Sequence, residues 1–369
     1  MAPFPEDLAP RLLATPALIA AILYEKHGRL LSFYRVDLEL QRLGAFIPEA
    51  TRDSWMAWAA KQLGKLLLPL KTLLFEPGLL YSDGTGFDVI EPHLGTRLGQ
   101  ITVFASERAI FYSFTPTKEG FHQRIFLGLE GPDGKPPSSE TPEGKPLPEP
   151  PRFRGFMVCD AASTADRNFL DGTVIECACN AHARRKFEDV EETNRRLALE
   201  ALAFWAGLYA VEKEATRRKL DAAGRYQLRQ EKSVPLLGDF RRWLDQHHGK
   251  GLPKEPLTKA LNYLHNHWAA LTRFVENGRI PIDNNWSERL LKAVAVGRHN
   301  FMFAGSDAGA ERSAIFFTFV ATCRQHGVDA MEWLTDVLPR IAHTRPSHLP
   351  ELLPEQWMAK RRALESQAA

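Results

Sequence analysis

The spacing of apolar residues changes at Pro77, and this change limits the folds open to the chain. Between residues 12 and 74, apolar side chains such as Leu63, Leu66 and Leu70 recur at helical spacing, which predicts helices. After Pro77 they gather in short β-branched and aromatic runs, which predict strands. Helical spacing returns later in the chain. The sequence therefore predicts a mixed α/β protein.

Composition and charge exclude several classes of protein. Of the 369 residues, 44% are hydrophobic and 25% are charged, which excludes a disordered chain, a collagen-like repeat and a coiled-coil rod. The formal charge is only +2, so a nucleic-acid partner would have to be met by local basic patches. Four cysteines make no disulfide framework, and no apolar run reaches the roughly 18 residues that span a bilayer. We therefore expect a cytoplasmic protein without membrane contact.

The strand-rich region has a predictable order. Strands are predicted at residues 79–81, 100–104 and 109–114, close enough together for an antiparallel meander, with a helix at 118–127. Further strands are predicted at 153–159 and 173–177, with a short helix at 162–169 between them. Residues 131–151 hold eight prolines and three glycines, which predicts a peripheral loop that cannot bury a face.

The second half of the sequence is predicted to be mainly helical. Residues 182–277 show helical spacing, with predicted breaks at 234–235 and 249–253. Closing helices are expected at 285–296, 312–325 and 330–342, the first of them ended by Gly297.

Two segments before Pro77 allow alternative interpretations. Residues 33–43, Gly44 and residues 48–59 have the pattern helix, tight turn, helix. This pattern is found in DNA-reading helix-turn-helix motifs, but a plain αα-hairpin is its more common cause. Near the start, Thr15 and Pro16 have the residue types of an N-cap and a first helical position, which predicts a helix start rather than a signal peptide.

The familiar motifs of phosphate binding, zinc proteolysis and serine hydrolysis do not occur in the sequence. Cys177, Cys179 and His182 lie close together and could supply metal ligands. A structural zinc site usually has a fourth ligand and wider spacing, so we favour a packed, reduced cysteine pair.

Acidic residues at strand ends are the stronger candidates for a site. Asp83 and Asp160 each follow an apolar strand, and carboxylates brought together in this way can share a divalent cation. Each could instead be a turn residue, and Asp88 competes with Asp83 on the same segment. Glu288 follows Asn285 at capping-box spacing, so it is either a helix-start residue or a third carboxylate.

Three blocks of the sequence resemble the insertion-sequence-66 family of bacterial transposases. They are the Asp-Asn-Asn-x-x-Glu-Arg run from Asp283 with the Gly-Arg-His-Asn-Phe run from Gly297, the Cys-Asn-Ala-His-Ala-Arg-Arg-Lys-Phe run from Cys179, and the entry segment from Ala14 to Trp55. The blocks stand in the family's order and cover most of the chain. The family's N-terminal zinc-binding region has no counterpart before Ala14.

The resemblance implies a fold, a site and a reaction. The expected fold is a ribonuclease-H-like catalytic core with a large α-helical insertion and a helical, helix-turn-helix-like N-terminal region. The expected site is Asp83, Asp160 and Glu288, which act as catalytic residues and as ligands of two Mg²⁺ ions, with Mn²⁺ as a substitute. The expected reaction is cleavage of DNA at the transposon ends and transfer into target DNA.

The same resemblance divides the chain into five parts. Residues 1–75 would be the helical N-terminal region that could bind DNA, and residues 76–180 the first part of the core. Residues 181–278 would be the insertion, residues 279–345 the closing helices of the core, and residues 346–369 a C-terminal tail.

DNA is the expected partner, and two basic groups are candidates for contacting its phosphates. They are Arg184, Arg185 and Lys186 in one group and Arg298 and His299 in the other. For each, a solvated helix face or pairing with a neighbouring carboxylate is the simpler explanation. A homodimer or higher oligomer on DNA, accessory proteins encoded by the element and a place at the bacterial nucleoid are further expectations.

The sequence departs from the family pattern at two acids. Gly84 follows Asp83 where the family has glutamate, and Ala161-Ala162 follow Asp160 where the family has Gly-Tyr. Two alternatives to an active transposase therefore stand. One is an inactive remnant that only binds DNA, and the other is a structural protein that uses its αα-hairpin for interaction.

Overall fold

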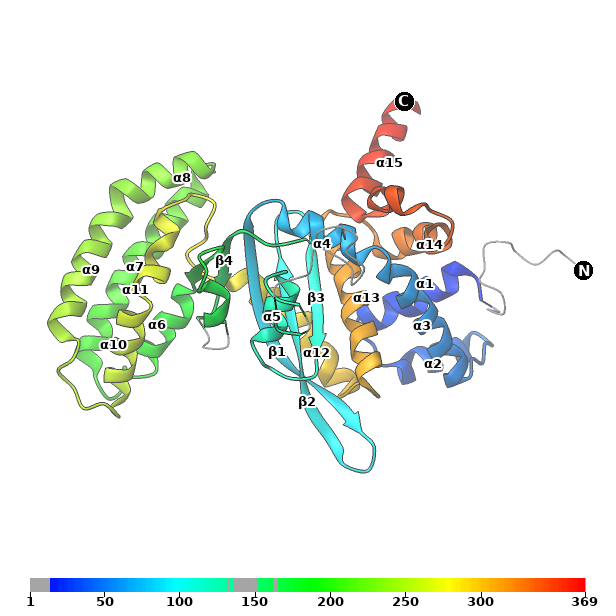
Figure 1. The fold of residues 1–369 in the computed structure, drawn as a ribbon, viewed down its shortest axis with the longest axis horizontal. Coiled ribbons are helices and arrows are strands. Elements are labelled where there is room, and N and C mark those ends of the chain that lie inside the picture. The colour runs from blue at the N-terminus through cyan, green and yellow to red at the C-terminus, as the bar shows by residue number, and fades with distance from the viewer. Residues whose placement is uncertain (1–13, 132, 136–150, 162–164, 369) are drawn as a thin grey trace, which may run out of the picture. The chain divides into compact units, whose positions relative to one another are not determined.

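The computed structural model describes residues 14–131, 133–135, 151–161 and 165–368, and these fall into two compact units. The first unit takes its residues from Met1–Pro77, Asp83–Arg152 and Ser287–Ala369, and the second from Gly78–Ser82 and Phe153–Trp286. Figure 1 shows the helices and strands that make up each unit. Most of the proline-rich segment 131–151 lies outside the described residues, as does the first part of the helix predicted at 162–169.

A five-stranded sheet confirms the α/β class. Its strands, in the order β3-β2-β1-β4-β5, are β1 (Leu79–Glu91), β2 (Gly95–Ala105), β3 (Ile110–Thr115), β4 (Gly155–Cys159) and β5 (Val174–Ala178). Strands β2 and β3 are antiparallel, whereas β4 runs parallel to β5 and to the first residues of β1. All five predicted strands are present. Strand β1 is ten residues longer than predicted because its polar and glycine-rich middle hides the alternation of a strand.

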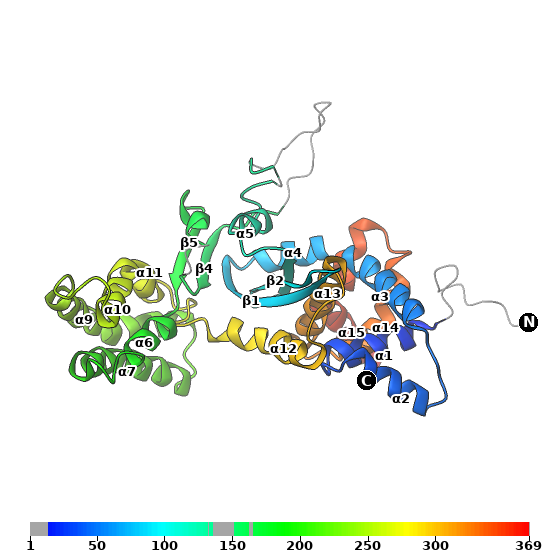
Figure 2. The ribbon, with the colours of Figure 1, turned by 90° about the horizontal axis from the view of Figure 1, so that it is seen from below.

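The first unit also contains a set of helices. They are α1 (Pro16–His27), α2 (Phe33–Arg42), α3 (Glu49–Gly64), α4 (Leu67–Phe75), α5 (Phe121–Phe126), α13 (Asp307–Gln325), α14 (Ala330–Ile341) and α15 (Pro354–Ala368), together with most of α12 (Asn285–Phe301). Helix α1 packs against α13 and α14, and α3 packs against α13 (Figure 2). Thr15 caps α1 as predicted, since its hydroxyl accepts a hydrogen bond from the Leu18 amide at 3.3 Å.

Edge strand β3 is covered by α13 through two buried threonines. The Thr318 hydroxyl accepts a hydrogen bond from the Tyr112 amide at 2.9 Å, and that of Thr322 accepts one from the Ile110 amide at 3.2 Å. Thr322 also donates to the Ile110 carbonyl at 2.9 Å. These hydroxyls satisfy backbone groups that an open edge would leave to another chain, so the helix closes the sheet on this side.

The second unit contains β4, β5 and a set of helices. The helices are α6 (Asn180–Glu188), α7 (Arg195–Arg217), α8 (Ala222–Leu228), α9 (Val234–His247), α10 (Pro256–Asn266) and α11 (Trp268–Thr272). The predicted break at 249–253 is confirmed, but the one at 234–235 is wrong. Pro235 lies in the first turn of α9, where its missing N–H costs nothing, and a π-helical turn at Arg229–Ser233 joins α8 to α9.

The prediction that Gly297 ends a helix is also wrong. Helix α12 continues to Phe301, and Gly297 lies buried inside it. A Cβ at this position would stand 2.8 Å from the Phe301 ring and 3.6 Å from Phe317. The glycine therefore leaves room for the Phe301 ring of the same helix instead of forming a left-handed turn.

A buried arginine holds the helices of the second unit together. Arg229 is only 1% exposed, and its guanidinium contacts both carboxylate oxygens of Glu212, at 2.7 and 2.9 Å. The same group donates to the backbone carbonyls of Phe274, Asn277 and Ile280. One fully satisfied side chain thus joins α7, the π-helical turn and the segment before α12.

Two glycines fix the start of the parallel strands in the second unit. Gly155 has a φ of +133°, and a Cβ there would collide with the Gly78 carbonyl oxygen and come within 3.0 Å of the Gly78 Cα. The Phe156 amide donates to the Gly78 carbonyl at 2.9 Å. The resulting register pairs Leu79 with Phe156 and Tyr81 with Val158.

We expect Gly155→Ala to lower the free energy of unfolding of the second unit by about 2 kcal/mol or more, because left-handed strain adds to a backbone collision. Gly172→Ala is the matched control. Gly172 has a φ of +69° but no atom within 4 Å of an added Cβ, so its alanine variant should show only the strain, about 1 kcal/mol. Equal losses in urea unfolding would show that the collision is relieved without cost.

The core of the first unit contains a histidine that cannot accept a proton easily. His27 is buried, and burial together with the neighbouring Lys26 charge lowers its pKa to about 3. Its ring contacts those of Phe316 and Phe317 at centroid distances of 4.9 and 5.2 Å. The folded state therefore keeps this imidazole neutral at any pH where the unfolded chain titrates.

This histidine predicts acid sensitivity. The unfolded chain binds a proton at His27 as the pH falls below about 6.5, whereas the folded chain does not, so stability present above that pH is lost below it. Lowering the pH from 7 to 5 should cost about 2 kcal/mol at this residue. Urea unfolding at both pH values checks the difference. The variant His27→Gln should show a smaller difference, and an unchanged one would assign the effect to other groups.

Candidate functional site

Strand β1 presents its two candidate aspartates on opposite faces. Side chains alternate along a strand, so Asp83 shares a face with Thr85 and Phe87, whereas Asp88 lies on the other. Thr85 and Phe87 are the residues that contact α12, through a 3.1 Å hydrogen bond from Arg298 and a ring contact with Phe301. In the first unit, Asp83 is therefore on the α12 face of β1 and Asp88 is not.

Glu288 lies near the start of α12, the helix that faces Asp83. It is half-buried, between the buried Ser287 and the exposed Arg289. The Tyr112 hydroxyl donates to the Leu290 carbonyl at 2.9 Å, which ties this turn of α12 to β3. Glu288 and Asp83 thus belong to elements of the first unit that pack on each other.

The capping-box interpretation of Glu288 does not fit the helix start. Helix α12 begins at Asn285, so Asn285 and Glu288 are both inside the helix, whereas a capping box needs its first member to precede the helix. The carboxylate of Asp283 takes the local role instead. It accepts hydrogen bonds from the Asn285 amide at 3.2 Å and from the Asn285 side chain at 2.8 Å.

Arg298, a predicted phosphate contact, is a structural tie in the first unit. Its guanidinium donates to the Thr85 hydroxyl and, at 2.7 Å, to the Gly86 carbonyl. These bonds fix the middle of β1 to α12, two residues beyond Asp83. The neighbouring His299 is exposed.

Asp160 follows β4 in the second unit and stays half-exposed. The Tyr263 hydroxyl donates to its backbone carbonyl at 3.4 Å. Burial and then the Asp160 charge raise the pKa of Tyr263. Within the residues that the structure describes, the Asp160 carboxylate has no hydrogen bond or ion pair, so its oxygens are available to a ligand.

The residue after Asp160 adopts a conformation that favours glycine. Ala161 has a φ of +46°, in the left-handed region, and is 7% exposed. This is the position where the sequence has alanine in place of the glycine of the resemblance. The chain thus keeps the sharp turn behind Asp160 at the cost of backbone strain.

Basic residues of α6 divide into paired and stacked side chains. Arg184 forms an exposed ion pair with Glu188 at 2.8 Å, as the simpler explanation requires. The Lys186 ammonium lies 4.4 Å from the centre of the Tyr263 ring. Arg185 is exposed. The predicted DNA contact of this cluster stays a prediction.

The cysteines favour the packed interpretation over a metal site. All four are buried and free. Burial raises the pKa of Cys177 to about 12 and that of Cys179 to about 11, so both thiols keep their protons at neutral pH. The Cys179 sulfur accepts a hydrogen bond from the Asn284 amide at 3.2 Å. Both are thus packed, protonated thiols in this structure.

Asn284 is a positioning residue that the sequence analysis missed. It is fully buried in the second unit, and its side-chain amide donates to the Ser82 carbonyl at 2.8 Å. This bond ties the segment before α12 to β1, next to Asp83 in the chain. The signal was present, because Asn284 is the middle residue of the Asp-Asn-Asn run.

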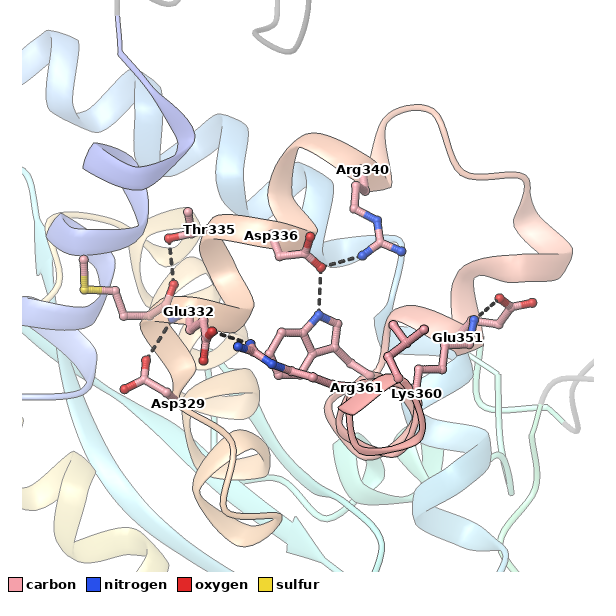
Figure 3. A pocket seen from close by; sticks show the side chains of 11 residues that line it. Asp329, Glu332, Thr335, Asp336, Arg340, Glu351, Lys360 and Arg361 are labelled. Atoms are coloured by element: carbon pink, nitrogen blue, oxygen red, sulfur yellow. Dashed lines mark hydrogen bonds and ion pairs between the residues drawn. The ribbon is translucent and has the colours of Figure 1, made fainter. Parts of the chain in front are cut away.

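A groove of about 1010 Å³ in the first unit lies between α14 and α15 and contains none of the predicted site residues (Figure 3). Its charged side chains are engaged with one another. Arg361 pairs with Glu332, and Asp336 accepts hydrogen bonds from Arg340 and from the Trp357 ring nitrogen. A groove whose charges are already neutralised in this way is a poor place for polar catalysis.

Comparison with known proteins identifies the class. The model of the family "Transposase IS66 family" matches residues 11–312, and that of the "IS66 C-terminal element" matches residues 318–354. The chain therefore belongs to the IS66 family of transposases. No helix in the described residues is long and apolar enough to cross a membrane.

Similar proteins extend along nearly the whole chain. The uncharacterized proteins y4hP and y4jD of Sinorhizobium fredii (strain NBRC 101917 / NGR234) are 28% and 29% identical to it. The matches cover 96% and 97% of this chain but 64% and 69% of those proteins. The chain thus spans about two thirds of the length of these relatives.

The strained turn at Ala161 yields a test. Ala161→Gly should raise the free energy of unfolding by about 0.5–1 kcal/mol, because glycine adopts the left-handed region without strain. Ala165→Gly should instead lower it, since Ala165 is buried with an ordinary φ of −91°. Thermal or urea unfolding measures both. A loss of stability in Ala161→Gly would mean that the buried methyl group matters more than the strain.

Proposed function

We propose that the chain is a DDE-type transposase that cleaves DNA at transposon ends and transfers the new 3′ ends into target DNA. Asp83, Asp160 and Glu288 would form its acidic site. The parallel register of β1 and β4 is the observation that carries this proposal. From the family we further propose a homodimer or higher oligomer on DNA at the bacterial nucleoid, assisted by element-encoded proteins.

The register supports a pairing of the two aspartates. Tyr81 is paired with Val158 in the second unit, and Asp83 and Asp160 are each the second residue beyond these partners. A ladder continued in that register would set the two aspartates opposite each other on neighbouring parallel strands. Carboxyl ends of parallel strands are also the usual place of a site in an α/β sheet.

The contact between β1 and α12 supports Glu288 as the third carboxylate. Asp83 is on the α12 face, and Glu288 is half-buried on α12. Arg298 fixes the two elements to each other in the first unit, which limits how far either carboxylate can drift. We assign Arg298 this positioning role in place of the phosphate contact expected from sequence.

The donor set fits Mg²⁺. All three groups are carboxylates, the hard oxygen ligands that Mg²⁺ prefers, and the Asp160 carboxylate makes no competing bond within the described part of the chain. When bound, two such ions supply an activated nucleophile and neutralise charge on the phosphate. Mn²⁺ suits the same ligands. Asp83, Asp160 and Glu288 are the residues that would hold the ions.

The residues of the chain position the reaction. The β1 ladder and the Asn284 bond to Ser82 hold the strand that leads into Asp83. The left-handed turn at Ala161 directs the chain away after Asp160. These backbone constraints set where each carboxylate begins. A phosphodiester held there would present its phosphorus to a 3′-hydroxyl or water in line with the leaving 3′-oxygen of the cleaved strand, or of the target strand in transfer.

A catalytically inactive remnant that only binds DNA is the second candidate, and one contact favours it. A Cβ on Gly84 would collide with the Gln100 side-chain amide, so Gln100 occupies the space in which the family's glutamate would begin. This departure lies next to the first acid. Activity of the unaltered chain decides between the candidates.

We expect Asp83→Asn, Asp160→Asn and Glu288→Gln each to reduce Mg²⁺-dependent cleavage of transposon-end DNA by at least 100-fold, because an amide brings no charge to the cation. Their melting temperatures should stay close to that of the parent. Asp88→Asn is the matched control, since Asp88 lies on the opposite face of β1, and it should retain activity. Cleavage of labelled duplex measures all four.

Two outcomes would contradict the proposal. Parent-like cleavage by any of the three carboxylate variants would remove that residue from the site. An inactive parent that still binds DNA would favour the remnant, and Gly84→Glu combined with Gln100→Ala would then test whether the departure at Gly84 caused the loss.

A further inference from the structure

The second unit contains a groove of about 770 Å³ that none of the predicted sites explains. Its walls are the last turns of α7, the start of α8 and the segment 278–283. The lining is rich in charge. Five cations face two carboxylates there: Lys213, Arg217, Arg225, Arg229 and Arg279 against Glu212 and Asp283.

Both carboxylates are already engaged. The Glu212 carboxylate pairs with Arg225 and with Arg229, each at 2.7 Å. Burial alone would raise the pKa of Glu212, but the hydrogen bonds and charges of the two arginines outweigh it and lower the pKa. Asp283 accepts hydrogen bonds from the Tyr209 hydroxyl at 3.1 Å and from Asn285. The lining holds more cations than carboxylates and both acids already have partners, so the groove presents a positive surface.

Lys213 and Arg217 carry most of that surface. They stand one turn apart on α7, both exposed, and neither forms a hydrogen bond or ion pair with any residue that the structure describes. Like charges at this spacing repel each other. On the same helix, Arg196 pairs with Glu200 at 2.8 Å and Arg218 with Glu214 at 3.2 Å. The cations of α7 in the groove therefore lack the partners that these neighbours have.

The groove is built by close backbone packing. A Cβ on Gly278 would collide with the Ala222 carbonyl, so only glycine lets the segment 278–283 approach α8. Arg229, buried beneath, donates to the Asn277 and Ile280 carbonyls and holds the same segment. The cationic walls are thus part of a rigid feature of the second unit, and a ligand would not have to form it.

We propose that this groove binds the phosphate backbone of duplex DNA, with Lys213 and Arg217 as the principal contacts. Its charge complements a polyanion, and the segment 278–283 runs directly into α12, the helix that carries Glu288. The inference rests on the proposed function in taking DNA as the partner. It adds a DNA-contact surface on α7. The sequence analysis had placed the DNA contacts elsewhere, in α6 and at the end of α12.

The test is binding of fluorescein-labelled duplex DNA, followed by anisotropy in EDTA over a range of salt. Lys213→Ala/Arg217→Ala should weaken binding at least tenfold at about 0.1 M salt and lower the slope of log Kd against log[salt] by about 2. Arg196→Ala/Arg218→Ala is the matched control. It removes the same charge from the same helix outside the groove and should change affinity less than twofold. Circular dichroism confirms that both variants fold.

Three outcomes would overturn the proposal. The first is a Lys213/Arg217 variant that binds DNA as tightly as the parent, and the second is an equal loss of DNA affinity in both double variants. The third is a Lys213/Arg217 variant that no longer binds an acidic peptide such as polyglutamate but binds DNA as the parent does. Failure of the proposed catalysis is seen separately, because a parent that binds DNA but does not cut it with Mg²⁺ leaves the groove assignment intact. A groove variant that binds weakly yet cuts at saturating DNA supports both proposals.

Discussion

The contact between Gly78 and Gly155 is the constraint on which the proposed site depends. The two backbones approach so closely that no side chain fits between them, and this fixes which residue of β1 meets which residue of β4. Side chains alternate along a strand, so a slip of one residue would turn every side chain of β4 to the opposite face. The pairing of Asp83 with Asp160 that we propose requires the register without such a slip. Two residues without side chains thus fix the register on which the proposed site rests.

Much of the fold follows from local sequence signals. Thr15 and Pro16 mark the start of α1, and short β-branched and aromatic runs locate β2 and β3. The errors have physical causes. Serine and glycine conceal the middle of β1, and Pro235 is harmless because it lies in the first turn of its helix. Gly297 looks like a helix end but leaves room for the Phe301 ring one turn later in the same helix.

The candidate site was less predictable because its determinants are long-range. Arg298 looked like a phosphate contact, yet its partners Thr85 and Gly86 are more than 200 residues earlier in the chain. Asp83 could be preferred over Asp88 only once Thr85 and Phe87 were seen to face α12. Motif resemblance supplied the three carboxylates, since no periodicity or spacing singles out a set drawn from three distant segments.

The buried cysteines have a practical consequence. Cys159, Cys177, Cys179 and Cys323 are all enclosed, and burial raises the pKa of each thiol. A maleimide reacts with exposed thiolate, so the folded chain should be nearly inert to it. Cysteines introduced on the surface would then take dyes without removal of the native ones. With one such cysteine on α7 and another on α3, energy transfer between the two dyes would report the distance between the two units as DNA is added.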